Sequence, residues 1–262
     1  FQQLLELQES GSLIENIVSQ DLFQLKELQA FMMNWRDRVP NKWDDIDMWR
    51  DILYWRNHFM AYLPTKFDPN LPHPKVCVNE SVAILNTFAS ISRKHNIVVP
   101  ALTALKESEV LIHKHLNDLD TREYGTRYYE LVKCFESQQF YENVIQTIDY
   151  EVEFKKLRLP RRLDLLRVRA DVLNKLGHQK DALDVYSSSV FLFPKAIINS
   201  AAPCDSLGRV FLEWSELLDQ ISNNSPSAEN YINVIVGYMQ AVRFGCKQAI
   251  PFLSRVMWLM TN

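Results

Sequence analysis

The sequence predicts an all-α protein, an α-solenoid of antiparallel helix pairs of the tetratricopeptide-like type. Apolar residues recur every three or four positions along most of the chain, and no segment shows the alternation expected of a strand. Only 6 of the 262 residues are glycine, which is few for the tight turns of parallel-sheet folds and phosphate-binding loops. Residues 166–194 also resemble a tetratricopeptide unit, whose period is about 34 residues.

The composition limits the classes of protein to which this chain can belong. With 47% hydrophobic residues the chain can bury a substantial core, and its net charge of -3 argues against a general binder of nucleic acid or membrane surfaces. No apolar run reaches the roughly 20 residues of a membrane span. The sequence starts at Phe1 without a signal peptide, so we expect a segment of a longer protein.

Residues 1–64 are predicted to form the first group of helices. Ser10-Gly11-Ser12 is expected to separate an opening helix from the next one, because clustered small polar residues are typical of breaks. Asp21 is a candidate cap for the second helix. The apolar residues of these two helices are Leu4, Leu5 and Leu7, then Leu25, Leu28, Met32 and Trp35.

The stretch Val39–Arg56 holds three tryptophans and four aspartates, a composition that an aromatic cage or a carboxylate pair would also have. On a helix, successive six-residue steps rotate a side chain by roughly 240°, so the three tryptophans point in three directions. They cannot form one cage. Trp43, which precedes the expected helix, is a candidate hydrophobic staple.

The aspartates of this stretch also have structural explanations. Asp44 or Asp45 is expected to cap the helix, while Asp47 and Asp51 lie on its polar face beside Arg50. The sequence therefore predicts an ordinary amphipathic helix and no site. Its expected apolar arc comprises Ile46, Trp49, Ile52, Leu53, Phe59, Met60 and Leu63.

Residues 65–79 are predicted to be a proline-rich linker, since Leu63–Lys75 contains four prolines and cannot be one continuous helix. Residues 80–262 are then expected to form stacked helix pairs that bury a continuous core between neighbours. The apolar stripes of these helices are Val82, Leu85 and Ala89; Leu102, Leu105, Ile112, Leu116 and Leu119; Tyr124, Tyr128, Leu131 and Phe135; Tyr141, Val144, Ile148 and Val152; Leu163, Leu166, Ala170 and Leu173; Ala182, Tyr186 and Phe193; Leu207, Val210, Trp214, Leu217 and Ile221; Ile232, Ile235 and Met239; and Ile250, Leu253, Val256 and Met260.

The tetratricopeptide-like unit is the most specific of these pairs. The small side chains of Ala170 and Ala182 allow two antiparallel helices to approach closely. Gly177 is expected to end the first helix, and Pro194 to close the second. Some tetratricopeptide proteins bind a C-terminal carboxylate through a Lys/Asn clamp, but Asp171 stands where that clamp needs asparagine, so we do not expect this activity.

The sequence offers no catalytic, cofactor-binding or metal-binding residues. His113 and His115 are two residues apart and lie on different helix faces, and the four cysteines are far from one another. The chain contains no HExxH, GxGxxG, GxxxxGK[ST] or GxSxG pattern. We therefore predict a protein that is not an enzyme and holds no cofactor.

One basic segment is a candidate surface for acidic partners. It comprises Lys155, Lys156, Arg158, Arg161 and Arg162. The alternative is a solvated turn between helices, partly offset by neighbouring acidic residues, and this alternative is favoured because most charge runs only solvate the surface.

Several stretches of the chain are similar to one known family. Trp35, Arg36, Arg38, Pro40, Asp44, Asp45, Trp49, Ile52, Trp55 and Arg56 carry the first similarity, within residues 33–58. Segments 83–105, 180–191, 238–245 and 252–260 follow in the same order. These stretches resemble the FAT domain of the TRRAP family, very large pseudokinase relatives of the phosphatidylinositol-kinase-related kinases.

The resemblance implies a scaffold in the nucleus. Members of that family sit in histone acetyltransferase complexes such as SAGA, which they bring to promoters through transcription activators. Their FAT helices wrap a kinase-like domain that lacks catalytic residues. The implied partners are other subunits of such a complex, transcription activators and the kinase-like domain of the same chain, with no direct nucleic-acid contact and no membrane.

Two other functions remain open. The chain could be the regulatory FAT segment of an active phosphatidylinositol-kinase-related protein kinase, which HRD- and DFG-like motifs in the rest of the protein would favour. Neither motif occurs in these 262 residues. It could also be a stand-alone tetratricopeptide adaptor, which a natural protein of about this size would favour.

Overall fold

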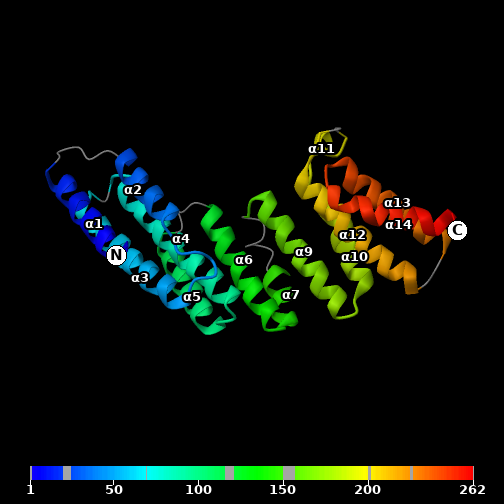
Figure 1. The fold of residues 1–262 in the computed structure, drawn as a ribbon, viewed down its shortest axis with the longest axis horizontal. Coiled ribbons are helices and arrows are strands. Elements are labelled where there is room, and N and C mark those ends of the chain that lie inside the picture. Colours follow the sequence, from blue (N-terminus) through cyan, green and yellow to red (C-terminus); the bar gives the residue numbers. More distant parts are fainter. Residues whose placement is uncertain are drawn as a thin grey trace. The chain divides into compact units, whose positions relative to one another are not determined.

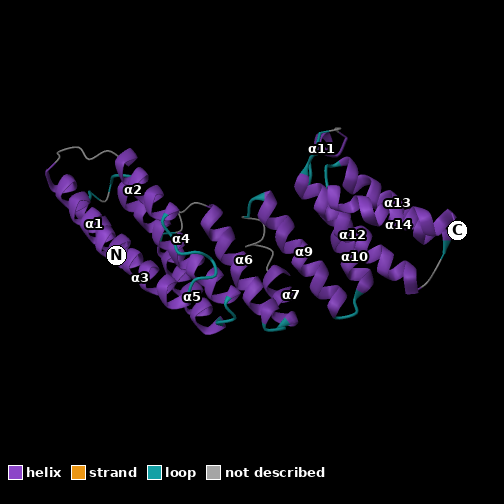
Figure 2. Ribbon diagram, in the orientation of Figure 1, coloured by secondary structure: helices purple, strands orange, loops and turns teal. Residues whose placement is uncertain are grey.

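A computed structural model describes residues 2–19, 25–68, 70–115, 121–149, 157–199, 202–224 and 227–261. All regular elements in these ranges are helical (Figure 2). The chain divides into two compact units, Phe1–Gln138 (unit 1) and Gln139–Asn262 (unit 2). Most helices pack against a helix that neighbours them in the sequence, which confirms the predicted all-α helical-repeat fold (Figure 1). Asp21, Leu116, Leu119, Val152, Lys155 and Lys156, named above from the sequence, lie outside the described ranges.

Unit 1 is built around α4. Helix α4 (His73–Lys94) packs against α3 (Ile46–Tyr62), α5 (Val98–Lys114) and α6 (Thr121–Ser137), and it supplies several fully buried residues such as Val82 and Ala89. The helices of this unit are α1 (Gln2–Ser19), α2 (Leu25–Asp37), α3 (Ile46–Tyr62), a 3-10 turn η1 (Leu63–Lys66), α4 (His73–Lys94), α5 (Val98–Lys114) and α6 (Thr121–Ser137).

Helix α1 runs without interruption through Ser10-Gly11-Ser12, so the predicted break there is wrong. The Ser10 hydroxyl donates a hydrogen bond to the Glu6 carbonyl oxygen at 2.6 Å, one turn back in the same helix. A glycine inside a helix costs only about 1 kcal/mol, which tertiary packing offsets. The buried face of α1 is formed by Glu6, Ser10, Leu13 and Ile17, whereas Leu4 and Leu7 are exposed.

Helix α3 begins as the aspartates predict. The Asp45 carboxylate caps it by accepting a hydrogen bond from the backbone N–H of Asp47 at 3.0 Å. Trp43 is 79% exposed under the Lys42 ammonium group, so its predicted role as a hydrophobic staple is wrong. The predicted apolar arc is confirmed, because Trp49, Ile52, Leu53, Phe59, Met60 and Leu63 are all buried and Ile46 packs against them.

The proline-rich stretch is partly helical. Helix α4 begins at His73, inside the predicted linker, with Pro72 just before it and Pro74 in its first turn. Proline is tolerated there because the first backbone N–H groups of a helix have no intrahelical partner. The assignment of residues 1–64, 65–79 and 80–262 to separate domains stays a prediction.

Unit 2 contains the tetratricopeptide-like pair, α9 and α10, whose close approach is confirmed by fully buried Ala170 and Ala182. Gly177, at φ 84°, ends α9 in a Schellman motif: His178 N–H donates to the Leu173 carbonyl at 2.9 Å, and Gly177 N–H to that of Asn174 at 2.9 Å. The helices of this unit are α7 (Tyr141–Asp149), α9 (Leu159–Lys175), α10 (Gln179–Val190), α11 (Lys195–Asn199), α12 (Asp205–Asn224), α13 (Ala228–Arg243), a 3-10 turn η2 (Lys247–Ala249) and α14 (Ile250–Thr261).

The predicted face of α13 is only partly right, because Ile235 packs against a core cluster of unit 2 but the other two predicted residues do not. Ile232 and Met239 are about half exposed, while Val234, Tyr238 and Ala241 are buried. The reason is a close approach between α12 and α13, at which any side chain on Gly237 would collide with the Ser215 hydroxyl. Because α13 is apolar on several faces, its contact face is chosen by this small residue and not by apolar periodicity alone.

Candidate functional site

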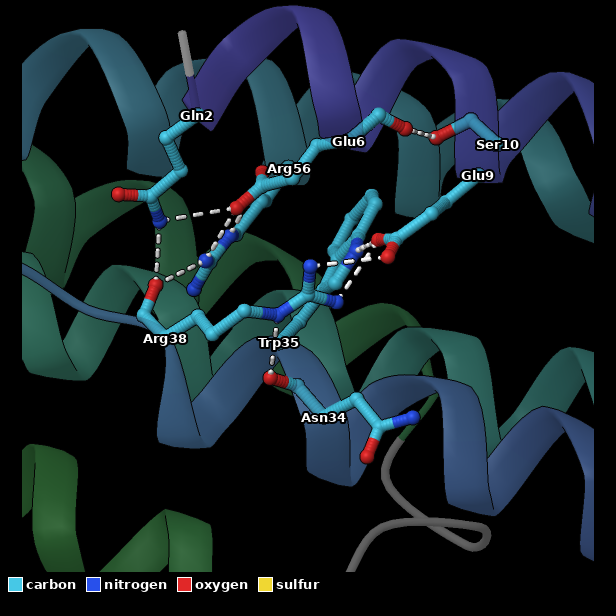
Figure 3. A network of polar contacts seen from close by, with 8 residues as sticks. All are labelled: Gln2, Glu6, Glu9, Ser10, Asn34, Trp35, Arg38 and Arg56. Carbon is cyan, nitrogen blue, oxygen red and sulfur yellow. Dashed lines mark hydrogen bonds and ion pairs between the residues drawn. The ribbon is translucent and has the colours of Figure 1, made fainter.

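A network of buried polar side chains joins α1 to α2 and α3 (Figure 3). At its centre the Glu6 carboxylate is 0% exposed and the Arg56 guanidinium 3% exposed. The two groups form a bidentate pair, with Arg56 Nε 3.1 Å from Glu6 Oε2 and Nη2 2.6 Å from Oε1. Arg56 Nη2 also donates to the Arg38 carbonyl oxygen at 2.6 Å, so the end of α2 is held in the same network.

A second ion pair extends the network toward the surface. Arg38 donates from Nη1 and Nη2 to the two carboxylate oxygens of Glu9 at 2.8 and 2.7 Å. The Trp35 indole N–H also donates to Glu9, at 3.2 Å. The hydrogen bonds from Arg38 hold the pKa of the Glu9 carboxyl below its ordinary value, and those to Glu9 raise the pKa of Arg38.

Such bidentate pairs suit the joining of helices better than proton transfer. The Glu6 carboxylate is held by Arg56 of α3 and the Glu9 carboxylate by Arg38, just after α2, and the geometry of such pairs is directional. General acid–base catalysis instead needs a carboxyl group poised to exchange its proton with a substrate in a cleft. The network therefore fixes how α1 lies on α2 and α3.

A cleft of about 460 Å³ lies between α2, α3, α4 and α6 in unit 1, and several charged side chains line it. Its buried carboxylates are also paired: Glu80 with Arg36, through Arg36 Nε at 3.0 Å, and Glu130 with Arg93 at 2.9 Å. The hydrogen bond to Glu80 raises the pKa of Arg36. Ion pairs of this cleft thus link α2 to α4 and α4 to α6.

Unit 2 also contains arginines that pair with a carboxylate on another helix. Arg169 pairs with Asp149 of α7 at 2.8 Å, and Arg167 Nε donates to Glu213 of α12 at 2.7 Å. Burial raises the pKa of the neighbouring Tyr186 hydroxyl, and Glu213 adds to this shift. Arg255 of α14 pairs with the buried Asp219 of α12.

Within the described residues, no group of three or more His, Cys, Asp or Glu side chains is arranged to hold a metal ion. None of the helices described is both long and apolar enough to span a membrane. The four cysteines are free thiols, and burial raises the pKa of Cys77 to about 12 and that of Cys134 to about 11. Such thiols are poor nucleophiles at neutral pH.

The FAT domain family model matches residues 1–258. The chain belongs to the FAT-domain family. The FAT segment is 22% identical over 285 residues to the SAGA complex/NuA4 acetyltransferase complex subunit TRA1 of Saccharomyces cerevisiae, and the match covers 100% of this chain and 7% of the yeast protein. It is 20% identical to the Transformation/transcription domain-associated protein of Homo sapiens, over 99% of this chain and 7% of the human protein. The similarity to the FAT domain of the TRRAP family is thus confirmed, and the chain spans a small part of these relatives.

A solved structure supports the fold of the FAT segment. The crystal structure of BtubC (BKLC) from P. vanneervenii matches with a TM-score of 0.51 at 12% identity, over 83% of this chain and 92% of that one. At this level of identity the likeness concerns the helical fold alone.

The residues that carry the similarity to the TRRAP family have architectural roles in this FAT segment. Arg38 and Arg56 hold α1, and Arg36 holds Glu80 of α4. The buried Trp49 indole donates to the Asn41 carbonyl at 3.0 Å, which ties α3 to the turn before it. Asp45 caps α3. The motif therefore positions the first four helices.

The predicted basic segment is only partly described. Lys155 and Lys156 lie outside the described ranges. Arg158 is exposed just before α9, while Arg161, 3.4 Å from Asp164, and Arg162 are half-buried in its first turn. The arginines that follow, Arg167 and Arg169, are held in the ion pairs with α12 and α7. The structure does not show these five residues as one surface.

The sequence alone did not reveal the carboxylates that pair with Arg56, Arg36 and Arg93. Glu6, Glu80 and Glu130 are buried, although glutamate is rarely buried unless it is paired. The spacing of the sequence does contain one indication that Glu6 is buried, because Glu6 lies at helical spacing with Ser10, Leu13 and Ile17. Asp171, the residue that spoke against a carboxylate clamp, pairs with Lys175 of the same helix at 2.6 Å.

Proposed function

We propose that this FAT segment is a non-catalytic scaffold within a very large nuclear transcription coactivator subunit. That subunit would bring a histone acetyltransferase complex to promoters through transcription activators. The observation that carries the proposal is the match of the whole chain to subunits of that kind, in which the matching residues join helices. Its partners would be other subunits of the complex, activators and a kinase-like domain of the same protein.

The ion pairs support an architectural role. Arginines from α2, α3, α9 and α14 each bind a carboxylate on another helix of the same unit, so charge serves to fix the helix arrangement. A helical array held in this way presents extended surfaces to partners, which is how solenoids commonly work. No direct nucleic-acid binding is part of the proposal, in keeping with the net charge of -3.

The test uses the full-length natural protein, tagged and purified from its own cells with and without Arg36→Ala/Arg56→Ala. We expect the unaltered protein to bring down histone acetyltransferase activity, and the double variant to lose part of its associated subunits. Arg50→Ala, on the exposed face of α3, is the matched control and should retain them. Transfer of phosphate from labelled ATP by the purified protein would instead favour the active-kinase alternative. A natural protein near 30.7 kDa would favour the stand-alone adaptor.

We also propose the basic segment Lys155, Lys156, Arg158, Arg161 and Arg162 as a contact for acidic partner segments. The exposure of Arg158 and the concentration of positive charge support this proposal. Replacing all five by alanine in the full-length protein should weaken at least one partner interaction in a salt-dependent manner. If every interaction persists, the segment is a solvated turn.

A further inference from the structure

A largely apolar groove of about 660 Å³ runs over α4 in unit 1, with the end of α3 and η1 on one side and α5 on the other. We propose that this groove binds an acidic amphipathic helix of a partner protein. The inference deepens the proposed scaffold function, on which it rests, because it names one place and one class of partner. It concerns α3, α4 and α5, and not the basic segment of unit 2.

The floor of the groove is suited to apolar side chains. Met60, Leu85 and Leu111 line it together with Pro64 and Val78, and these side chains come from four successive elements. Val110 stands at its edge and is 61% exposed, so it offers apolar surface to an occupant of the groove. Clefts of this size that combine an apolar lining with a few polar groups are typical binding sites.

The length of the groove fits a short helix. The residues of α4 that line it, from Pro74 through Val78 and Ser81 to Leu85, lie on one face and extend over about 16 Å at 1.5 Å per residue. That length equals roughly three turns of a second helix. A helix lying along α4 would place apolar residues with spacing i, i+3 or i+4, and i+7 between α3 and α5, as in other helix-in-groove complexes.

The charge around the groove favours an acidic occupant. Two lysines, Lys75 and Lys114, line it against the single carboxylate of Glu107. Lys75 lies in the first turn of α4, where the helix dipole adds partial positive charge. Lys114, the last residue of α5, is exposed, so a carboxylate on the outer edge of a bound helix can reach it.

The binding test uses the 262-residue chain and a fluorescein-labelled synthetic helix. The probe carries leucine at i, i+3, i+4 and i+7 and glutamate at the flanking positions, and its anisotropy reports binding. A matched probe has glutamine in place of each glutamate. We expect saturable binding of the acidic probe that weakens with added salt, and weaker binding of the glutamine probe.

Two pairs of variants place the binding in the groove. Val110→Asp should weaken binding on the order of ten-fold or more, because it puts a carboxylate on the apolar edge. Its control, Val99→Asp, changes an exposed valine of the same helix outside the groove. Lys114→Glu should weaken binding about five-fold and reduce its salt dependence, whereas Lys106→Glu, exposed on α5 outside the groove, should not. Circular dichroism of each variant checks that the helices are retained.

Three results would overturn the inference. The first is the absence of binding up to millimolar probe, and the second is equal binding by Val110→Asp and Val99→Asp. The third is a concentration-dependent dimer in sedimentation that Val110→Asp abolishes, since it would make a second copy the occupant. If the unaltered 262-residue chain does not bind the probe while the unaltered full-length protein still brings down acetyltransferase activity, only the groove is refuted. Absence of acetyltransferase activity from the purified unaltered full-length protein would instead refute the scaffold function.

Discussion

Glu6 and Arg56 lie 50 positions apart in the sequence, and each is buried where the other neutralises it. Desolvating two such charges costs about as much as their attraction returns, so the pair adds little net stability over apolar residues of similar size. The pair contributes mainly to the specificity of helix packing. Two parallel hydrogen bonds accept only one orientation of α1 on α3, and the Arg56 guanidinium also lies 5.4 Å from the centre of the Trp35 ring.

Removing one partner of this pair leaves the other charge buried and uncompensated. We expect Arg56→Ala to lower the free energy of unfolding of unit 1 by about 3–5 kcal/mol, measured by urea denaturation. Arg50→Ala on the exposed face of the same helix should cost less than about 1 kcal/mol. Glu6→Leu/Arg56→Met should recover part of the loss. An Arg56→Ala cost as small as that of Arg50→Ala would contradict the buried pair.

Glu9 gives this part of the molecule a dependence on pH. Because Arg38 lowers the pKa of Glu9 in the folded state, its stabilising contribution is fully present above the ordinary value of 4.5 and is lost as pH falls through the lowered pKa. Glu9→Gln should therefore be less stable than the unaltered chain at neutral pH, and the difference should shrink in acid. Urea titrations at several pH values measure it. A difference that stays constant from neutral pH to below 4.5 would show that the charge of Glu9 is not involved.

At the scale of helices, the sequence predicts an element well when one apolar face decides how it packs. The arc of α3, the α9–α10 pair and the Schellman end at Gly177 all follow from local spacing and turn chemistry. Helix α1 was divided wrongly because its buried face contains the polar residues Glu6 and Ser10, and the Glu6 carboxylate is paired with Arg56 far along the chain. On α13 the position of Gly237 selects the contact face, and only the neighbouring α12 reveals this.

The ion pairs could not be predicted for a related reason. Helical spacing places a charged residue on the solvent side of a helix, and a buried charge can be recognised from the sequence only when its partner is near in sequence. Glu80 and Arg36 are 44 positions apart, and Arg167 and Glu213 are 46 apart. The similarity to the TRRAP family pointed to Arg36, Arg38 and Arg56, but their carboxylate partners required the fold.

Two glycines of this chain should respond in opposite ways to alanine. Gly11 lies inside α1, and a Cβ added there would meet no atom within 4 Å. Gly11→Ala should therefore stabilise unit 1 by about 0.5–1 kcal/mol through the lower entropy of the unfolded chain. Gly177 also has open space, but its φ of 84° strains any L side chain, so Gly177→Ala should destabilise unit 2 by about 1–2 kcal/mol. Thermal unfolding of both variants tests this. Stabilisation by Gly177→Ala would contradict the Schellman end of α9.

At the scale of the molecule, each unit holds its own core and its own ion pairs. Trp35, Trp49 and Met60 belong to the core of unit 1, whereas Tyr186, Leu207 and Phe244 belong to a core in unit 2. In helical-repeat proteins stability is close to a sum of local terms, because each element contacts only its neighbours. A local loss of packing should therefore open one part of the chain and leave the rest folded.

Trp49→Ala tests this locality, since Trp49 is 3% exposed and its indole holds the turn before α3. Losing a buried tryptophan costs about 3–5 kcal/mol, and we expect hydrogen exchange to accelerate throughout α1 to α4. The peptides of α9, α10, α12 and α13 should keep their protection. Leu207→Ala, at a fully buried position of unit 2, is the matched control and should give the opposite distribution. If either variant accelerated exchange equally in both units, the chain would unfold as one cooperative body and the division at residue 138 would have no energetic meaning.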